Sequence, residues 1–280
     1  MACLCAIQCY YDVRFFLQEA KKSCRGRWYL PAGRLEPNET LVEGVKREVL
    51  EETGLRYEPE TILCVEMNGV AWQRVTFIGK ATSGRLKPKP DEESLDAKWM
   101  KYPDLKSQPI RSGDIFSLIE LGLEYLKLKP ADAKSPKKAD FAPVMPIERR
   151  FDRIFIRLAM TTTFDDARHV LVDASTQRLP VLGMGGTSSN VKRVLTIAAK
   201  HLTHGGLKEL VCQGLLAVEH DGRDPQNDEA DRDGLCHTFH LKIVVESTAS
   251  RAPGFEWEKL DERTNALMAE RKLSPAVLFL

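Results

Sequence analysis

Three glutamates near residue 50 have the spacing that a metal site on a helix requires. Glu48, Glu51 and Glu52 lie three and four positions apart, so on a helix that turns about 100° per residue they share one narrow arc. Like charges at these spacings destabilise a helix by roughly 0.2–0.5 kcal/mol per pair. A divalent cation would remove that cost, and carboxylate oxygens are the ligands that Mg²⁺ prefers. The spacing therefore predicts a site for Mg²⁺, with Mn²⁺ as a substitute.

A cation held by these carboxylates would act on phosphates. Mg²⁺ usually keeps several waters and binds substrate phosphates beside its carboxylate ligands. It would polarise a phosphoryl oxygen, activate a bound water and shield the leaving phosphate. The alternative interpretation is a solvated, glutamate-rich helix without a ligand. Four further residues at fixed distances favour the metal site: Gly33, Glu39, Arg47 and Gly54.

The helix that positions the glutamates is expected over residues 40–53. Thr40 and Glu43 form a capping box at its start, and Gly54 suits a left-handed C-cap at its end. Arg47 can reach Glu51 one turn later and offset part of the repulsion. An apolar stripe lies beside the glutamate arc, so the carboxylates are expected at the edge of the buried face: Leu41, Val42, Val45 and Val49.

The rest of the chain alternates predicted strands and helices, which is typical of an α/β fold. In the first half, strands are expected at 2–10, 13–18, 28–30, 61–67, 72–81 and 95–100, and a second helix at 115–128. In the second half, strands are expected at 154–160, 169–173, 214–219 and 238–246, and a helix at 190–202. Residues 129–138 lack an apolar period and contain prolines, which indicates an exposed linker. We therefore expect a catalytic domain at 1–128, a linker at 129–150 and a second domain at 151–280.

The second half repeats landmarks of the first. Leu-Pro precedes Gly33 and also Gly183, and each of these glycines is followed by a predicted helix that ends at a glycine, Gly54 or Gly205. A duplicated fold is the economical explanation. Aligning the two terminal glycines places three non-acidic residues where the glutamates stand: Ala199, Leu202 and Thr203. The second domain is therefore expected to lack a metal site, and to pack on the first domain or to contribute the surface of a homodimer.

Composition and charge limit the class of partner. The chain has 41 basic and 40 acidic residues, which argues against binding a nucleic-acid polymer and is compatible with a small anionic substrate. Its seven cysteines include no CxxC pair, and its apolar first residues are too few to span a membrane. We expect reduced thiols and a cytoplasmic protein without a membrane segment.

The segment from Gly33 to Leu55 resembles the Nudix hydrolase box at every defined position. The resemblance implies an α/β/α sandwich with a mixed sheet, followed here by a degenerate Nudix-like α/β domain. It implies metal ligands at Glu48, Glu51 and Glu52, with Glu52 or Glu51 tied to water activation. It also implies roles for the surrounding residues: a carbonyl ligand at Ala32-Gly33, a carboxylate-orienting Arg47, a loop-bracing Glu39, and a late acidic ligand, with Glu93 the candidate and Glu92 next to it.

A wider stretch is similar to the animal MutT-like enzymes that degrade oxidised guanine nucleoside diphosphates. The similarity covers about residues 2–128 and includes the segments 19–21, 24–26, 28–34, 58–61 and 93–95, and Arg111 with Asp114-Ile115. It implies hydrolysis of 8-oxo-dGDP to 8-oxo-dGMP and phosphate, which would keep oxidised guanine out of the nucleotide pool. The alternatives are another nucleoside diphosphate derivative, such as a nucleotide sugar, and a non-catalytic nucleotide-sensing protein.

Four residues near the box are candidates for substrate contacts. Arg25 and Arg34 could pair with phosphates, because a guanidinium matches them bidentately, although solvated loop arginines are an equal alternative. Tyr29 and Trp72 could stack on a purine. The alternative for both aromatic residues is a place in the hydrophobic core.

Overall fold

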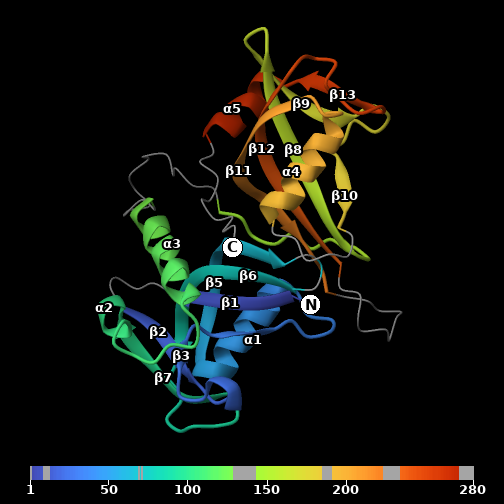
Figure 1. Cartoon of the computed structure of the whole chain (residues 1–280). Helices are drawn as coiled ribbons and strands as arrows, with labels where there is room; N and C mark the ends of the chain where they lie inside the picture. The colour runs from blue at the N-terminus through green and yellow to red at the C-terminus, as the bar shows by residue number, and fades with distance from the viewer. Residues whose placement is uncertain are drawn as a thin grey trace. The chain divides into compact units, whose positions relative to one another are not determined.

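The computed structural model describes residues 2–8, 13–68, 70, 72–128, 143–184, 191–222 and 234–270 (Figure 1). The chain divides into two compact units. The first comprises Met1–Val65, Arg74–Ala139 and Asp221–Gln226, and the second Glu66–Gln73, Asp140–His220 and Asn227–Leu280. Residues 129–142 of the predicted linker, which was expected at 129–150, and the end of the first predicted strand, at 9–10, lie outside the described residues. Within the described ranges, no helix has the length and apolar character needed to cross a membrane.

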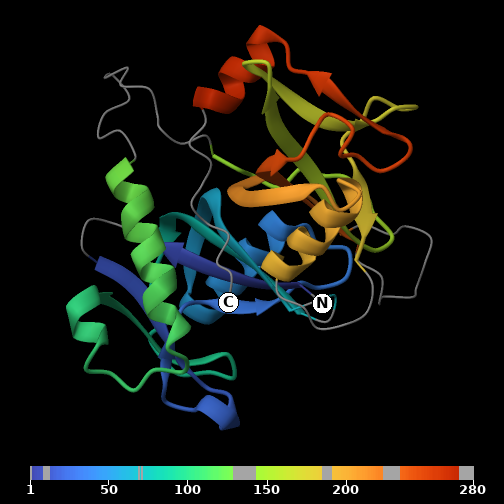
Figure 2. The ribbon, with the colours of Figure 1, turned by 45° about the horizontal axis from the view of Figure 1, so that its top comes forward.

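The first half of the chain forms two sheets and the helices around them. The strands are β1 (Ala2–Gln8), β2 (Val13–Glu19), β3 (Trp28–Tyr29), β4 (Ala32–Arg34), β5 (Leu55–Asn68), β6 (Trp72–Gly84) and β7 (Ser94–Lys101). The helices are α1 (Leu41–Thr53), α2 (Tyr102–Leu105) and α3 (Asp114–Leu128), with a short 3-10 turn at Lys22–Cys24. The sheet orders are β4-β1-β6-β5 and β3-β2-β7. Helix α1 packs against β1 and β4, and α3, shown beside the strands in Figure 2, packs against β1.

Helix α1 has the boundaries that its end signals predicted. The Thr40 hydroxyl accepts a hydrogen bond from the Glu43 N–H at 3.2 Å, and the Glu43 carboxylate accepts one from the Thr40 N–H at 2.9 Å. Gly54 closes the helix in the left-handed conformation, with a φ of 79°. The apolar stripe is buried through Leu41 and Val49, which are fully covered. The capping box, the C-cap and the buried face are confirmed.

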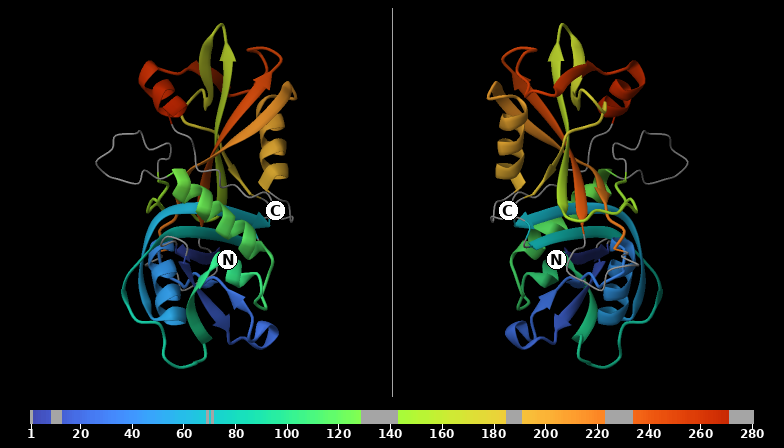
Figure 3. Two further views of the ribbon diagram at one scale, coloured as in Figure 1. Left: turned by 90° about the vertical axis from the view of Figure 1, so that its left-hand side faces the viewer. Right: turned by 90° about the vertical axis from the view of Figure 1, so that its right-hand side faces the viewer.

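The second half of the chain forms one mixed sheet. Its strands are β8 (Ile154–Phe164), β9 (Ala167–Asp173), β10 (Val181–Gly183), β11 (Leu207–Glu219), β12 (Leu235–Val245) and β13 (Phe255–Lys259). Their order is β11-β12-β8-β9-β13, with β10 also paired to β8. Strands β12 and β8 run parallel, whereas the other pairs are antiparallel. The helices are α4 (Val191–Leu202), which runs along these strands in Figure 3, and α5 (Glu262–Glu270). The expected α/β fold with a mixed sheet is confirmed.

The strand neighbours of the first half recur in the second. The series β4-β1-β6-β5 corresponds to β10-β8-β12-β11, and the pair β2-β7 corresponds to β9-β13. Helix α1 lies between β4 and β5 along the chain, and α4 lies between the corresponding strands β10 and β11. Identical neighbours in an identical chain order are what a duplicated fold produces.

The structure moves the alignment of the two helices by one residue from the predicted one. Thr53 and Thr203 are both fully buried, and each donates its hydroxyl to the carbonyl four residues earlier, at 2.6 and 2.8 Å. These threonines therefore correspond, and Gly205 comes one residue later than Gly54 does. The cause is an additional left-handed residue, His204, whose φ of 51° precedes the 83° of Gly205.

The corrected alignment changes which residues replace the glutamates. The residues that correspond to Glu48, Glu51 and Glu52 are Ala198, His201 and Leu202. The predicted set was Ala199, Leu202 and Thr203. Ala198 and Leu202 are buried, as Glu48 and Glu52 are. The expectation that this helix offers no carboxylate ligands is unaffected, because α4 contains no acidic residue.

Candidate active site

Two of the three box glutamates are buried. Glu48 is 8% exposed and Glu52 4% exposed, whereas Glu51 faces solvent. Burial raises the pKa of the Glu48 carboxyl, partly opposed by the hydrogen bond and charge of Arg47. Burial also raises the pKa of Glu52 well above its ordinary value, and the nearby charge of Glu48 adds to the rise. Both pKa shifts show that the fold holds these carboxylates where their negative charge is costly.

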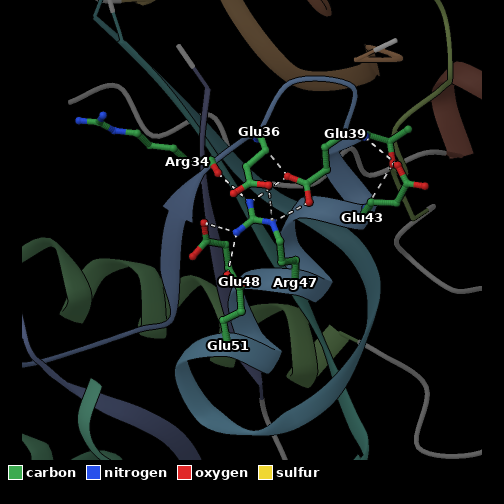
Figure 4. A network of polar contacts seen from close by, with 8 residues as sticks. Arg34, Glu36, Glu39, Glu43, Arg47, Glu48 and Glu51 are labelled. Atoms are coloured by element: carbon green, nitrogen blue, oxygen red, sulfur yellow. Dashed lines mark hydrogen bonds and ion pairs between the residues drawn. The ribbon is translucent and has the colours of Figure 1, made fainter. Parts of the chain in front are cut away.

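Arg47 lies at the centre of a network of carboxylates (Figure 4). Its guanidinium donates to both Glu39 oxygens, at 2.7 and 2.9 Å, and to Glu48 and Glu51, each at 3.0 Å. The fifth bond reaches the carbonyl of Arg34 at 2.9 Å. The hydrogen bond to Glu39 is the largest cause of a pKa above the ordinary arginine value. These bonds use every N–H of the guanidinium and fix two of the three glutamates.

Glu39 connects this network to the loop before the helix. Its second oxygen, which also binds Arg47, accepts a hydrogen bond from the backbone N–H of Glu36 at 3.0 Å. The loop after β4 is therefore tied to the middle of α1 through one carboxylate and one guanidinium.

Gly33 leaves the space that the Glu48 side chain occupies. A Cβ at this position would lie 1.9–2.0 Å from the three terminal atoms of the Glu48 carboxylate. A larger residue would therefore displace Glu48. The glycine of the predicted box is a steric requirement of the glutamate that faces it.

The carboxylate and the backbone of Glu52 are held separately. Its Oε2 accepts a hydrogen bond from the Ala32 N–H at 2.9 Å, and its carbonyl accepts one from the Ser94 hydroxyl at 2.7 Å. The next carbonyl, of Thr53, accepts from the Lys87 N–H at 3.0 Å. Strand β4 and the loop before β7 are thus attached to the C-terminal turn of α1.

That loop carries the late acidic candidates. Asp91 Oδ1 accepts hydrogen bonds from the N–H groups of Glu93 and Ser94, both at 3.0 Å. The negative charge of Glu93 is among the causes that raise the pKa of Glu48, so Glu93 lies near the box glutamates. This favours Glu93 as the late acidic candidate.

The donor set fits a hard divalent cation. In the part of the chain that the structure describes, no three His, Cys, Asp or Glu side chains are gathered closely enough to hold a metal. Two carboxylates are nevertheless buried with raised pKa values beside a glycine that leaves room for one of them. A cation would offset that burial, and oxygen-only donors suit Mg²⁺.

The four predicted substrate contacts differ in exposure. Arg25 is exposed and donates to the carbonyl of Ala20 at 3.1 Å, and the exposed side chain of Arg34 points away from the network (Figure 4). Tyr29 is 3% exposed, so its ring belongs to the core, as the alternative interpretation held. Trp72 is 39% exposed on β6.

Sequence reasoning assigned no role to a charged pair beside the box helix. Glu19 is buried at 2% exposure, and Arg111 donates to its Oε1 at 2.5 Å. The partners lie 92 residues apart, so no local spacing indicates the pair. The only sequence signal was their presence in the segments that resemble the MutT-like enzymes.

Two of the buried histidines in the second half, both outside this site, have lowered pKa values. Burial lowers the pKa of His237 to about 3 and that of His240 to about 4. His240 Nε2 lies 2.9 Å from the hydroxyl of Thr161. These side chains are neutral core residues at neutral pH.

Comparison with known proteins gives consistent matches. The family model "NUDIX domain" matches residues 7–118. The human 8-oxo-dGDP phosphatase NUDT18 is 38% identical over 254 residues, which cover 88% of this chain and 72% of the human protein. The mouse protein of the same name is 34% identical, covering 95% of this chain and 82% of its own. Among solved structures, a NUDIX hydrolase from Nitrosomonas europaea matches with a TM-score of 0.40 and 25% identity, covering 44% of this chain and 88% of that one.

Proposed function

Because the chain belongs to the Nudix hydrolase family, we propose that it hydrolyses 8-oxo-dGDP to 8-oxo-dGMP and phosphate. The observation that supports this most is the pair of buried carboxylates, Glu48 and Glu52, on a helix whose box is complete. The relatives that match most of the chain are named 8-oxo-dGDP phosphatases. In the reaction, the oxygen of water bonds to phosphorus, the anhydride P–O bond breaks, and the leaving phosphate oxygen takes the electron pair.

Nudix hydrolases use divalent metal ions, and we propose Mg²⁺ for this chain. Glu48, Glu51, Glu52 and Glu93 would hold it, together with a carbonyl at Ala32-Gly33. When bound, it would polarise a phosphoryl oxygen and lower the pKa of a bound water.

The chain's own residues hold the reacting groups in place. Arg47 fixes the orientation of Glu48 and Glu51, and Glu39 fixes Arg47. The N–H of Ala32 fixes Oε2 of Glu52, and we assign to this carboxylate the proton taken from the attacking water. Reacting groups held in this way are already oriented before substrate binds, which lowers the entropic part of the barrier.

We propose that residues 151–280 form a non-catalytic Nudix-like domain. Its helix α4 follows the burial of α1 but places Ala198 and Leu202 at the buried carboxylate positions. The catalytic domain is then residues 1–128, as the sequence predicted.

Chromatography of the products formed with Mg²⁺ tests the proposal directly, and release of phosphate is measured alongside for the diphosphates. The substrates are 8-oxo-dGDP, dGDP, 8-oxo-dGTP, ADP-ribose and a nucleotide sugar, and the variants are Glu52→Gln and, as a matched pair, Glu93→Gln and Glu92→Gln. We expect a preference for 8-oxo-dGDP and a loss of several orders of magnitude in Glu52→Gln, because the amide cannot accept the proton. Glu93→Gln should lose more activity than Glu92→Gln. Consumption of ADP-ribose alone, or of a nucleotide sugar, would overturn the oxidised-guanine assignment, and no turnover of any nucleotide would favour a sensing role.

A further inference from the structure

Arg111 is a fixed but accessible cation. Its Nη1 donates to Glu19 at 2.5 Å, its backbone N–H donates to the carbonyl of Trp28 at 3.0 Å, and its guanidinium carbon lies 4.9 Å from the centre of the Tyr29 ring. These contacts set the orientation of the guanidinium plane. The side chain is nevertheless 37% exposed. A guanidinium has five N–H donors, and among the described residues Glu19 is its one side-chain acceptor.

The ring beneath Arg111 is itself anchored. The Tyr29 hydroxyl donates to Asp114 at 2.8 Å and accepts from Arg74 at 2.7 Å, and Arg74 also binds Asp114 at 2.6 Å. Arg74 is 8% exposed at its side chain, so this triad is part of the core. Arg111 therefore rests on a rigid platform and loses little conformational freedom when it binds a ligand.

Glu19 places this cation beside the box helix. In the pairing of β2 with β7, Glu19 is the partner of Ser94, and the Ser94 hydroxyl donates to the carbonyl of Glu52. The charge of Glu19 is also among the causes that raise the pKa of Glu52. The guanidinium thus lies next to a group of carboxylates that would repel an incoming diphosphate.

We propose that Arg111 binds a phosphate oxygen of the nucleoside diphosphate, and that Glu19 is the positioning residue that holds its guanidinium toward the site. The proposal rests on the proposed function, which supplies the anionic substrate. Arginine suits this role because its N–H groups pair with two phosphate oxygens at once. A buried glutamate orients it, since Glu19 is 3% exposed at its side chain and would be strongly destabilised without its partner.

Steady-state kinetics with 8-oxo-dGDP and dGDP test the assignment. We expect Arg111→Gln to raise KM at least tenfold for both substrates with a smaller change in kcat, and Arg111→Lys to recover part of the loss. Glu19→Gln should change KM in the same direction. The double variant should be no worse than Arg111→Gln alone, because Glu19 acts through Arg111. A purely structural pair would lower the Tm of each variant and leave KM unchanged. Arg56→Gln, an exposed arginine on β5, is the matched control.

Two results would overturn the proposal. One is a KM for Arg111→Gln within twofold of the unaltered protein at an unchanged Tm. The other is a loss confined to 8-oxo-dGDP, which would place the guanidinium on the oxidised base. If the unaltered protein turns over neither nucleotide, the proposed function fails, and calorimetric titration of dGDP into Glu52→Gln, with and without Arg111→Gln, still decides this proposal.

Discussion

Replacing Gly33 by alanine should abolish most of the activity while the protein stays folded. The added Cβ would lie 1.9 Å from the nearest Glu48 carboxylate atoms, whereas ordinary contacts begin near 3.4 Å. The carboxylate must therefore retreat by about 1.5 Å. Because a displacement of about 1 Å in a catalytic group can cost about 100-fold in rate, we expect kcat to fall by about that factor or more.

The effect on stability should be much smaller. Glu48 would lose its hydrogen bond to Arg47, and a bond to a charged group contributes roughly 1.5–3 kcal/mol. Moving the carboxylate toward solvent would recover part of that loss, because its burial is costly. Alanine also reduces the entropy of the unfolded chain, by about 0.4–1 kcal/mol. The net change in the free energy of unfolding should stay below about 2 kcal/mol, which corresponds to a Tm decrease of about 5 °C or less.

The repeated fold provides the matched control. Gly183 is the counterpart in the second half, and among the described residues the nearest atom to its hypothetical Cβ belongs to the Phe155 ring, at 3.7 Å. Gly183→Ala should therefore leave kcat unchanged. Phosphate release and thermal unfolding of both variants give the comparison. If Gly33→Ala keeps more than a third of the kcat, or loses activity only because its Tm falls by more than about 10 °C, the steric reasoning is wrong.

Three further results are expected. Arg47→Lys should lower kcat/KM by about 10–100-fold with a small change in Tm, since an ammonium cannot replace the planar set of N–H donors. A kcat/KM equal to that of the unaltered protein would contradict the role of the network. Glu51→Ala should raise the Mg²⁺ concentration needed for half-maximal activity, whereas His201→Ala, at the corresponding exposed position of α4, should not; a titration of both variants decides this. His240 has a folded-state pKa of about 4, below its usual 6.5, so the stability from its neutral form is complete above pH 6.5 and is lost as pH falls through 4. Urea unfolding should show the wild type losing up to about 3 kcal/mol more than His240→Gln across that interval, and parallel curves would refute it.

The features that the sequence predicted well are local ones. The α1 helix is specified by a capping box, a periodic apolar stripe and a terminal glycine within 15 residues, 40–54, so its bounds could be read from neighbouring residues. The start of β5 was missed because Pro59 interrupts residues 55–60, although their alternation of apolar and charged residues is the pattern of a half-buried strand. The three-residue strands β4 and β10 were missed because pairing with β1 and β8 defines them, and no periodicity can show in three residues.

The parts of the site that could not be predicted depend on distant contacts. The Glu19–Arg111 pair joins two strand or loop ends that only the folded chain brings together. Tyr29 was a stacking candidate, but its bonds to Arg74 and Asp114 draw it into the core. The predicted alignment of α4 with α1 was wrong by one residue for a similar reason. It matched Gly205 with Gly54, but the left-handed residue His204 places Gly205 one position later.

The correspondence between α1 and α4 affects how the sequences of the two halves can diverge. A substitution at position 198 or 202 must only preserve the packing of the core, because these side chains fill space there. A substitution at Glu48 or Glu52 must preserve both the packing and the carboxylate. These two requirements conflict, since burial favours apolar residues. We therefore expect descendants of this chain to drift faster in the second half than in the first while keeping the same strand order. The sequence of the first half would then change slowly because this half performs the reaction. The sequence of the second half would vary more, as long as its core stays stable.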